Sequence, residues 1–314
     1  MSIGVQPLIF GVSGTKLTKE EAEFFIEVNP FGYIIFSRNI ESKAQVQELT
    51  NSLMALNPNR IPPILIDQEG GRVARLRPPL AKNYPTAQYF GEIAKRDLDA
   101  AYQEVLQNYY TIGLELKEFG INVDCAPVAD LLFESADEII GDRSFGSSVS
   151  IVSKLCEAAC IGLIKSGVRP ILKHIPGHGR AQCDSHKDLP IVTTDLPTLE
   201  STDFQVFKNL SSVSDAWVMT AHITFPAIDP YNCITTSKLG IHYIRNKLGY
   251  KDAKIISDDL SMKALKKTVG ENAIAALQAG CDIALHCNGE IEEMFDVYES
   301  VCNLNDSQSS IINQ

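Results

Sequence analysis

The sequence predicts an α/β fold, namely a single-domain (β/α)₈ TIM-type barrel, and three observations support this prediction. Short apolar runs alternate with longer stretches of helical spacing, and each kind occurs eight times. Reactive polar residues directly follow several of the apolar runs, at the strand ends where barrel enzymes build their active sites. A chain of 314 residues has room for one such barrel of about 250 residues with some additional segments.

Eight apolar runs rich in Ile, Val and Leu indicate the strands. In chain order they are Val5–Phe10, Tyr33–Phe36, Pro63–Ile66, Asn122–Ala126, Val168–Leu172, Ala216–Met219, Lys254–Ser257 and Cys281–Leu285. The helical stretches that follow them are Lys19–Val28, Lys43–Leu56, Ala100–Phe119, Ile151–Lys165, Leu199–Leu210, Lys238–Leu248, Glu271–Ala279 and Glu290–Leu304. An open, doubly wound sheet is the alternative architecture, because the number of strands does not establish that the sheet closes.

Local signals agree with these boundaries. Thr18 followed by Glu21 is typical of a helix start, and Gly167 is typical of a helix end. The uninterrupted alternation predicts one catalytic barrel domain over residues 1–304. The last ten residues, NDSQSSIINQ (305–314), are mostly polar, and we expect them to form a disordered tail.

Composition limits the partners of this chain. A net charge of −11 argues against nucleic acid or an anionic membrane as a partner. The N-terminal segment MSIGVQPLIFGVSG has no basic start, and its apolar run is too short for a secretion signal or a membrane span. We therefore expect a cytoplasmic protein, and further a monomer, acting on a small molecule. Eight scattered cysteines without a C-x-x-C pair are typical of reduced, buried thiols, and neither a metal nor another cofactor is expected.

The segment from Pro170 to His186, PILKHIPGHGRAQCDSH, is the strongest candidate for an active-site segment. Lys173 and His174 directly follow the fifth apolar run, and a loop rich in glycine and histidine comes next. Asp184 stands two residues before His186, and residues at this spacing in an extended segment point the same way. A histidine paired with an aspartate can donate a proton near neutral pH, which makes the two a candidate acid/base pair.

Polar residues also follow three other predicted strands. Asp67 follows the third run, His222 the sixth, and Asp258 and Asp259 the seventh. Each aspartate alone is also a plausible helix N-cap, and Asp259 fits a capping or orienting role better than a chemical one. His222 can line a pocket or satisfy the core. Because the carboxyl ends of barrel strands share one face, these residues are nevertheless expected to surround one site.

Four motifs carry a resemblance to a known family. They are IDQEGGRVARL (66–76), KHIPGHG followed by DSH (173–186), VMTAHI (218–223) and IISDDLSM (255–262). Together they resemble the bacterial β-N-acetylglucosaminidases of glycoside hydrolase family 3, and in particular the single-domain, cytoplasmic branch that recycles cell walls. The similarity runs from about Pro7 to Asn288, with the motifs in the expected order and spacing.

The resemblance implies a role for each matching residue. Asp258 corresponds to the catalytic nucleophile, His186 to the general acid/base, and Asp184 to the residue that orients His186. The residues that match the sugar-binding set of the family are Asp67, Arg75, Arg143, Lys173 and His174. The chemistry of these side chains agrees, since retaining hydrolysis requires a carboxylate at the anomeric carbon and a proton donor for the leaving oxygen.

The implied activity is that of a retaining exo-β-N-acetylglucosaminidase. Such an enzyme removes terminal non-reducing GlcNAc from peptidoglycan fragments, the GlcNAc-1,6-anhydroMurNAc muropeptides, through a covalent glycosyl-aspartate. Two related activities remain as alternatives, a β-glucosidase of the same family and a β-GlcNAc phosphorylase. A sugar-binding barrel without catalytic activity is the alternative of a different class, and the presence of both Asp258 and His186 disfavours it.

Overall fold

The computed structural model describes residues 4–133, 137–185 and 188–312, with side chains described as far as Asn303. The strands of the main sheet are β1 (Gln6–Gly11), β2 (Pro30–Ile35), β3 (Ile64–Ile66), β6 (Val123–Asp124), β7 (Arg169–Ile175), β8 (Trp217–Thr220), β9 (Ile255–Asp259) and β10 (Ile283–His286). The helices are α1 (Lys19–Val28), α2 (Lys43–Ala55), α3 (Ala87–Ala94), α4 (Leu98–Glu118), α5 (Val149–Ser166), α6 (Leu196–Ser201), α7 (Asp203–Leu210), α8 (Lys238–Asn246), α9 (Val269–Ala279) and α10 (Ile291–Ile312).

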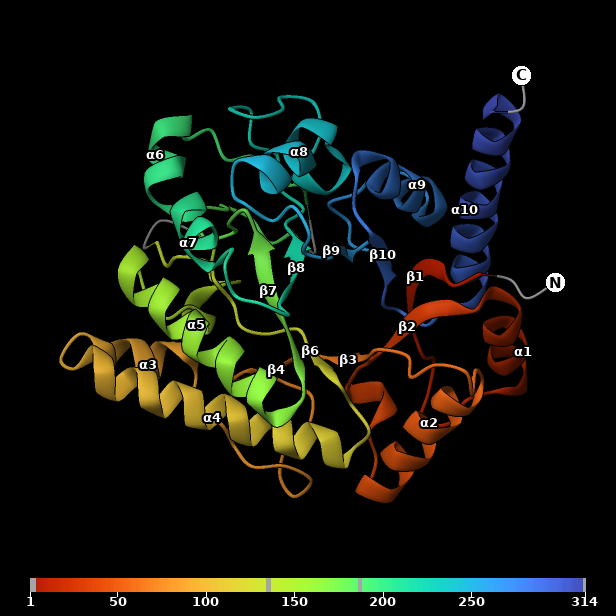
Figure 1. Ribbon diagram of the computed structural model, residues 1–314, viewed down its shortest axis with the longest axis horizontal. Coiled ribbons are helices and arrows are strands. Elements are labelled where there is room, and N and C mark those ends of the chain that lie inside the picture. The colour runs from red at the N-terminus through yellow and green to blue at the C-terminus, as the bar shows by residue number, and fades with distance from the viewer. Residues whose placement is uncertain (1–3, 134–136, 186–187, 313–314) are drawn as a thin grey trace.

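The main sheet is a closed barrel. Its strands are hydrogen-bonded in the order β1-β10-β9-β8-β7-β6-β3-β2, and every neighbouring pair is parallel. Figure 1 shows the helices arranged around the outside of this barrel. The predicted (β/α)₈ barrel is therefore confirmed, and the alternative of an open sheet is wrong.

Alternation along each strand divides the apolar residues into two cores. On β1, Ile9 points into the barrel, whereas Leu8 and Phe10 point outward to the helices, because successive side chains leave a strand on opposite sides. The inner core contains Ile9, Ile34, Leu65, Val123, Cys125, Ile171, Met219, Ile256, Ile283, Leu285 and Cys287. These residues fill the interior, so the barrel is a packed support for the polar residues at its rim.

Helix ends follow the signals in the sequence. The hydroxyl of Thr18 accepts from the backbone N–H of Glu21, and the Glu21 carboxylate accepts in return from the backbone N–H of Thr18. Glu21 also accepts from the N–H of Ser13 at 2.8 Å, which ties the loop after β1 to this helix. Gly167 ends α5 in the left-handed conformation, with φ 85°, that a residue without Cβ adopts readily.

Three departures from the predicted elements matter. The expected helix 199–210 is two helices, α6 and α7, that meet at Thr202, and α3 was not predicted. A short hairpin of β4 (Gln68–Gly70) and β5 (Val73–Ala74) follows β3 and carries residues of the site. The predicted domain boundary at residue 304 stays a prediction, although the α10 backbone continues as a helix to Ile312.

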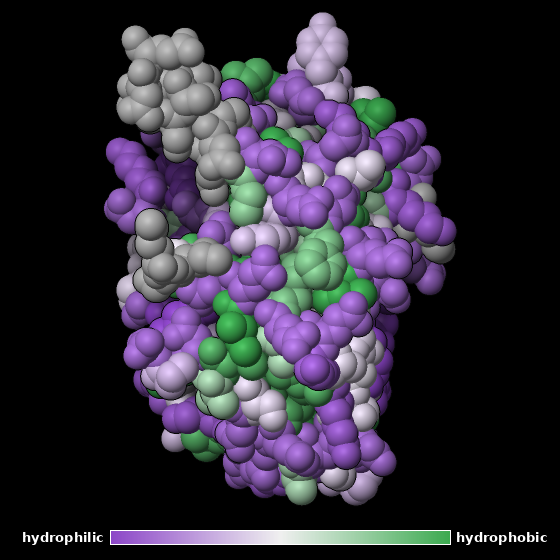
Figure 2. Space-filling view, turned by 90° about the vertical axis from the view of Figure 1, so that its right-hand side faces the viewer, coloured by the Kyte–Doolittle hydropathy of each residue, from purple (hydrophilic) through white to green (hydrophobic). Residues whose placement is uncertain are grey.

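The outer surface is mostly polar where it can be viewed. Figure 2 looks at the side of the molecule where α1 and α10 lie, and most of that face is hydrophilic, with hydrophobic residues gathered near its centre. Exposed apolar residues of α1 and α10 include Ile26 and Phe295. None of the helices in the described part of the chain has the length and apolar character needed to cross a membrane.

Candidate active site

A cavity of about 470 Å³ opens at the carboxyl ends of the barrel strands. This volume lies within the range of small-molecule sites. Six residues predicted from the sequence line it, namely Asp67, Arg75, Arg143, Lys173, His174 and Asp258. They come from segments far apart in the chain, so the fold brings together side chains that were predicted from separate motifs.

The predicted acid/base pair is only partly described. His186 lies outside the described residues. Asp184 lies within them, and its backbone carbonyl accepts from the N–H of Asp188 at 3.1 Å. Ser185, between the two members of the pair, is 3 % exposed and lines the cavity, where its hydroxyl is 3.0 Å from Nε2 of His178. The roles of Asp184 and His186 therefore stay predictions.

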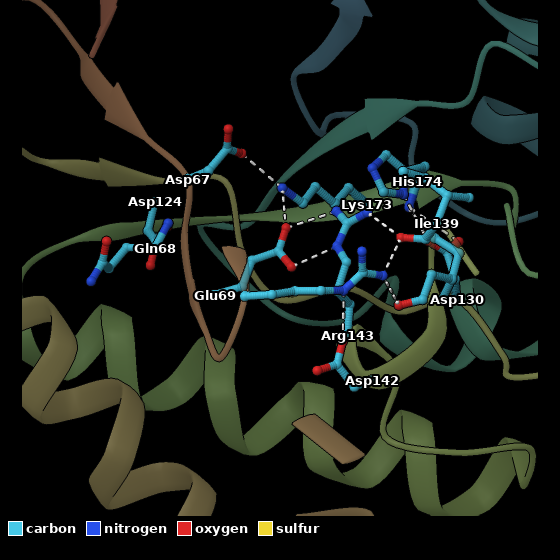
Figure 3. A network of polar contacts seen from close by, with 12 residues as sticks. Asp67, Gln68, Glu69, Asp124, Asp130, Ile139, Asp142, Arg143, Lys173 and His174 are labelled. Atoms are coloured by element: carbon cyan, nitrogen blue, oxygen red, sulfur yellow. Dashed lines mark hydrogen bonds and ion pairs between the residues drawn. The ribbon is translucent and has the colours of Figure 1, made fainter. Parts of the chain in front are cut away.

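Five charged residues of alternating sign form a row along one wall of the cavity. Asp67 accepts from Arg75 at 2.8 Å and from Lys173 at 2.8 Å. Glu69 forms an ion pair with Lys173 at 2.7 Å and accepts from Arg143 through two hydrogen bonds of 2.8 Å. Figure 3 shows Glu69 between Lys173 and Arg143, with contacts to both. The row fixes the position of each predicted sugar-binding cation.

These contacts keep both carboxylates ionised in a buried place. Burial raises the pKa of Asp67, but Lys173 and Arg75 outweigh this effect and hold the pKa well below its usual range. Burial likewise raises the pKa of Glu69, and Arg143 and Lys173 bring it down to about 2. In turn, burial lowers the pKa of Lys173 while Asp67 and Glu69 raise it above its usual range. The row is charged at neutral pH.

The free energy of unfolding is expected to fall in acid because Asp67 and Glu69 take up protons on unfolding. Their folded-state pKa values are depressed, so the stabilisation is complete above the unfolded-state pKa of about 4 and is lost as the pH falls through the folded-state pKa. Each group contributes a slope of up to about 1.4 kcal/mol per pH unit. Chemical unfolding from about pH 6 to about pH 2 measures this slope. Glu69→Gln should reduce it, and an unchanged slope would contradict the assignment.

Asp130 organises the histidines beside the row. Its buried carboxylate lies 2.7 Å from Nδ1 of His174 and accepts from the backbone N–H of His178 at 2.6 Å. Burial raises the pKa of Asp130, but His174 outweighs it, so the pKa is lowered and the carboxylate is ionised. A carboxylate at this distance requires a proton on Nδ1, which leaves Nε2 of His174 as the other ring nitrogen available to a ligand.

Asp258 is a carboxylate of the cavity that is not part of the charged row. It lies in β9, lines the cavity, and accepts from the backbone N–H of Asp259 at 2.8 Å. Burial raises its pKa, yet His222, His174 and other neighbouring groups lower it overall. An ionised, desolvated carboxylate at the mouth of a sugar-sized cavity has the properties of a nucleophile or of a base.

The neighbouring residues are structural. Asp259 accepts from the backbone N–H of Cys287 and from both the N–H and the hydroxyl of Ser261, so it shapes the loop after β9. His222 is fully buried, and its ring contacts the hydroxyl of Thr235 at 2.7 Å and the carbonyl of Asp259 at 3.0 Å. Both ring nitrogens of His222 therefore have partners within the core, and the ring supports the strand end that carries Asp258.

Sequence reasoning missed Glu69 and Asp130. A signal existed for Glu69, because it stands two residues after Asp67 in an extended segment and therefore points the same way. Asp130 follows the fourth predicted strand by four residues, and no local pattern marks it. Within the described residues, no group of three or more His, Cys, Asp or Glu side chains is placed to hold a metal ion.

Comparisons with known proteins identify the family to which this chain is similar. Residues 6–314 match the family described as glycosyl hydrolase family 3, N terminal domain. A beta-hexosaminidase of Nitrosomonas eutropha is 38% identical over 286 residues, which are 90% of this chain and 80% of that protein. The solved structure of NagZ from Neisseria gonorrhoeae, in complex with N-trifluoroacetyl-D-glucosamine, superposes with a TM-score of 0.86 at 32% identity, covering 97% of this chain and 86% of the other. A β-N-acetylglucosaminidase of the same family from Paenibacillus gives a TM-score of 0.90 at 31% identity, over 96% and 57%.

Proposed function

This chain belongs to glycosyl hydrolase family 3, and on that premise we propose that it is a retaining, exo-acting β-N-acetylglucosaminidase with Asp258 as its nucleophile. It is a glycoside hydrolase of the β-hexosaminidase type, as its relatives are. One observation supports the nucleophile above others. Asp258 is an ionised carboxylate that lines a sugar-sized cavity. Of the other carboxylates that line it, Asp67 and Glu69 are held by cations, and Asp259 accepts from Ser261 and from the backbone N–H of Cys287.

In the proposed first step, a carboxylate oxygen of Asp258 attacks the anomeric carbon of GlcNAc. The bond to the leaving oxygen breaks, and His186 gives that oxygen a proton. In the second step His186 takes a proton from water, the water oxygen bonds to the anomeric carbon, and the bond to Asp258 breaks. Two inversions give net retention. Asp184 would orient the imidazole of His186 and stabilise its charged form.

The charged row would hold the sugar through the donors that it leaves unused. Lys173 donates one of its three N–H groups to Asp67 and forms an ion pair with Glu69, which leaves a donor for a sugar hydroxyl. Arg143 donates three of its five N–H groups, two to Glu69 and one to the carbonyl of Ile139. His174 would add Nε2 of its ring. Each residue therefore offers few, directed hydrogen bonds, as recognition of a neutral sugar requires.

We propose peptidoglycan fragments as the substrate, with terminal GlcNAc on 1,6-anhydroMurNAc. This proposal rests on the resemblance of the motifs to the cell-wall-recycling branch of the family. The cytoplasmic location and the monomeric state rest on the sequence alone and stay proposals, as does the expectation of no nucleic-acid or membrane partner.

An assay with two aryl glycosides tests the function. The enzyme is expected to hydrolyse nitrophenyl β-GlcNAc far faster than nitrophenyl β-glucoside, and to release free GlcNAc at the same rate with and without phosphate. A faster reaction on the glucoside would identify a β-glucosidase. Release of GlcNAc-1-phosphate would identify a phosphorylase, and no turnover of either compound would favour a sugar-binding barrel.

A further inference from the structure

The row of alternating charges contains a residue to which the proposed reaction gives no role. Glu69 lies in β4, is 5 % exposed, and lines the cavity without being a predicted ligand of the sugar. Its two carboxylate oxygens receive two hydrogen bonds from Arg143, and one of them forms an ion pair with Lys173. Both cations are themselves buried, so the three groups share one site from which bulk water is largely excluded.

The charges of the row are nearly balanced only because Glu69 is present. Three cations, Arg75, Lys173 and Arg143, face two carboxylates, Asp67 and Glu69. Asp124 lies close by, and burial raises the pKa of its carboxyl well above the usual range. Without Glu69, Arg143 would lose its carboxylate partner and Lys173 would keep only Asp67.

We propose that Glu69 is a positioning and specificity-determining residue, which occupies an anion site between Arg143 and Lys173 and thereby keeps the cavity selective for neutral sugars. The proposal rests on the proposed function in that the cavity takes a sugar. A planar pair of N–H groups on Arg143 binds the two oxygens of Glu69 at 2.8 Å, and the ammonium of Lys173 lies 2.7 Å from one of these oxygens. Such an arrangement binds carboxylates and phosphates in proteins. The carboxylate of Glu69 fills this arrangement from within the chain.

Glu69 can be replaced without dismantling its hairpin. Its backbone carbonyl accepts from the hydroxyl of Tyr109 at 3.1 Å, independently of its side chain. The amide side chain of Gln68 closes the hairpin by accepting from the backbone N–H groups of Arg75 and Leu76 at 2.9 and 3.0 Å. These bonds do not involve the Glu69 carboxylate, so a variant should keep the backbone in place while emptying the anion site.

Chemical rescue is the direct test. Glu69→Ala should lose roughly 100-fold in kcat/KM on nitrophenyl β-GlcNAc. Arg143 and Lys173 would both lose the charged partner that orients their N–H groups. Added formate should restore activity at least about tenfold, saturably, by filling the vacated site. Formate should also raise the Tm of Glu69→Ala and leave the Tm of the unaltered enzyme unchanged. A Tm and an activity of Glu69→Ala that formate does not alter would overturn the proposal.

Glu69→Gln tests the charge at nearly constant volume and serves if the alanine variant does not fold. It should become competitively inhibited by inorganic phosphate, with an inhibition constant at least about tenfold below that of the unaltered enzyme. Glu118→Gln is the matched control, because it removes one negative charge from an exposed pair with Lys43 outside the cavity, and it should not respond to phosphate. Equal phosphate sensitivity of Glu69→Gln and the control would contradict the proposal. Because the Tm measurements need no turnover, an inactive enzyme would refute the proposed function separately.

Discussion

Replacement of Asp258 by alanine is expected to lower kcat/KM by about 10⁴-fold or more, and equally on a natural disaccharide fragment and on nitrophenyl β-GlcNAc. No leaving group, however good, replaces a missing nucleophile, so both substrates should suffer alike. Asp258 lines the cavity and is ionised there, and its removal takes away the carboxylate that faces the anomeric carbon in the proposed mechanism. Initial rates on both substrates measure the loss.

Two further results separate this role from a structural one. Azide added to Asp258→Ala should restore turnover of the nitrophenyl glycoside and give the α-glycosyl azide, since azide would enter from the face that the carboxylate vacates. Asp142→Ala is the control, because it removes a partly exposed carboxylate paired with Arg72 at the edge of the site. An exposed ion pair contributes little, so the rate of Asp142→Ala should stay within about threefold of that of the unaltered enzyme. Azide rescue with a β-azide as the product would show that Asp258 is not the nucleophile.

His186→Ala is expected to lose about 10²–10⁴-fold on the disaccharide and clearly less in the glycosylation step with nitrophenyl β-GlcNAc. A sugar alcohol leaves badly without a proton, whereas a nitrophenolate scarcely needs one. Deglycosylation should slow as well, because the same residue must then activate water. Asp184→Ala should follow the same pattern more mildly, since it tunes the imidazole without giving the proton.

The contrast between substrates decides the role of His186. The measurement is kcat/KM on each substrate, which reports the first irreversible step. His242→Ala, which alters an exposed histidine of α8, should match the unaltered enzyme on both. Equal losses on both substrates for His186→Ala would mean that His186 binds or shapes the site, and that another residue is the acid.

The barrel could be predicted from the sequence because its strands and helices differ in period. Each strand of the barrel overlaps an apolar run, and α1 has the predicted bounds, since its cap at Thr18 is a local signal. Strand ends were less accurate. The fifth run was expected to end at Leu172, whereas β7 continues to Ile175 and pairs there with Thr220. Lys173 and His174 are thus part of the strand, because backbone pairing extends beyond the apolar residues.

Features that depend on distant contacts could not be predicted. The break between α6 and α7 occurs at Thr202. Its hydroxyl contacts the carbonyl of Thr198 and the carboxylate of Asp203, and such local bonds compete with a continuous helix. Asp130 acquires its role only from the fold, which places it against His174. Its partner is 44 positions away in the chain, and no spacing rule links the two.

The charged row illustrates the same limit at the site. Its cations were nominated from the motifs, but the sequence does not show which carboxylate holds which cation. Glu69 joins Lys173 and Arg143, which lie 104 and 74 positions further along the chain, because the hairpin after β3 contributes Glu69 to the lining of the cavity. The order Arg75–Asp67–Lys173–Glu69–Arg143 emerges only in the folded molecule.

Trapping of the covalent intermediate tests the central claim most directly. A 2-fluoro analogue of the sugar, activated at the anomeric carbon, should inactivate the enzyme because the fluorine slows release of the glycosyl group more than its formation. Digestion and peptide mass analysis should then locate the added sugar on the peptide that contains IISDDLSM, with fragmentation placing it on Asp258. A label on another residue, or inhibition only by thiazoline mimics without any adduct, would contradict the mechanism and point instead to assistance by the 2-acetamido group.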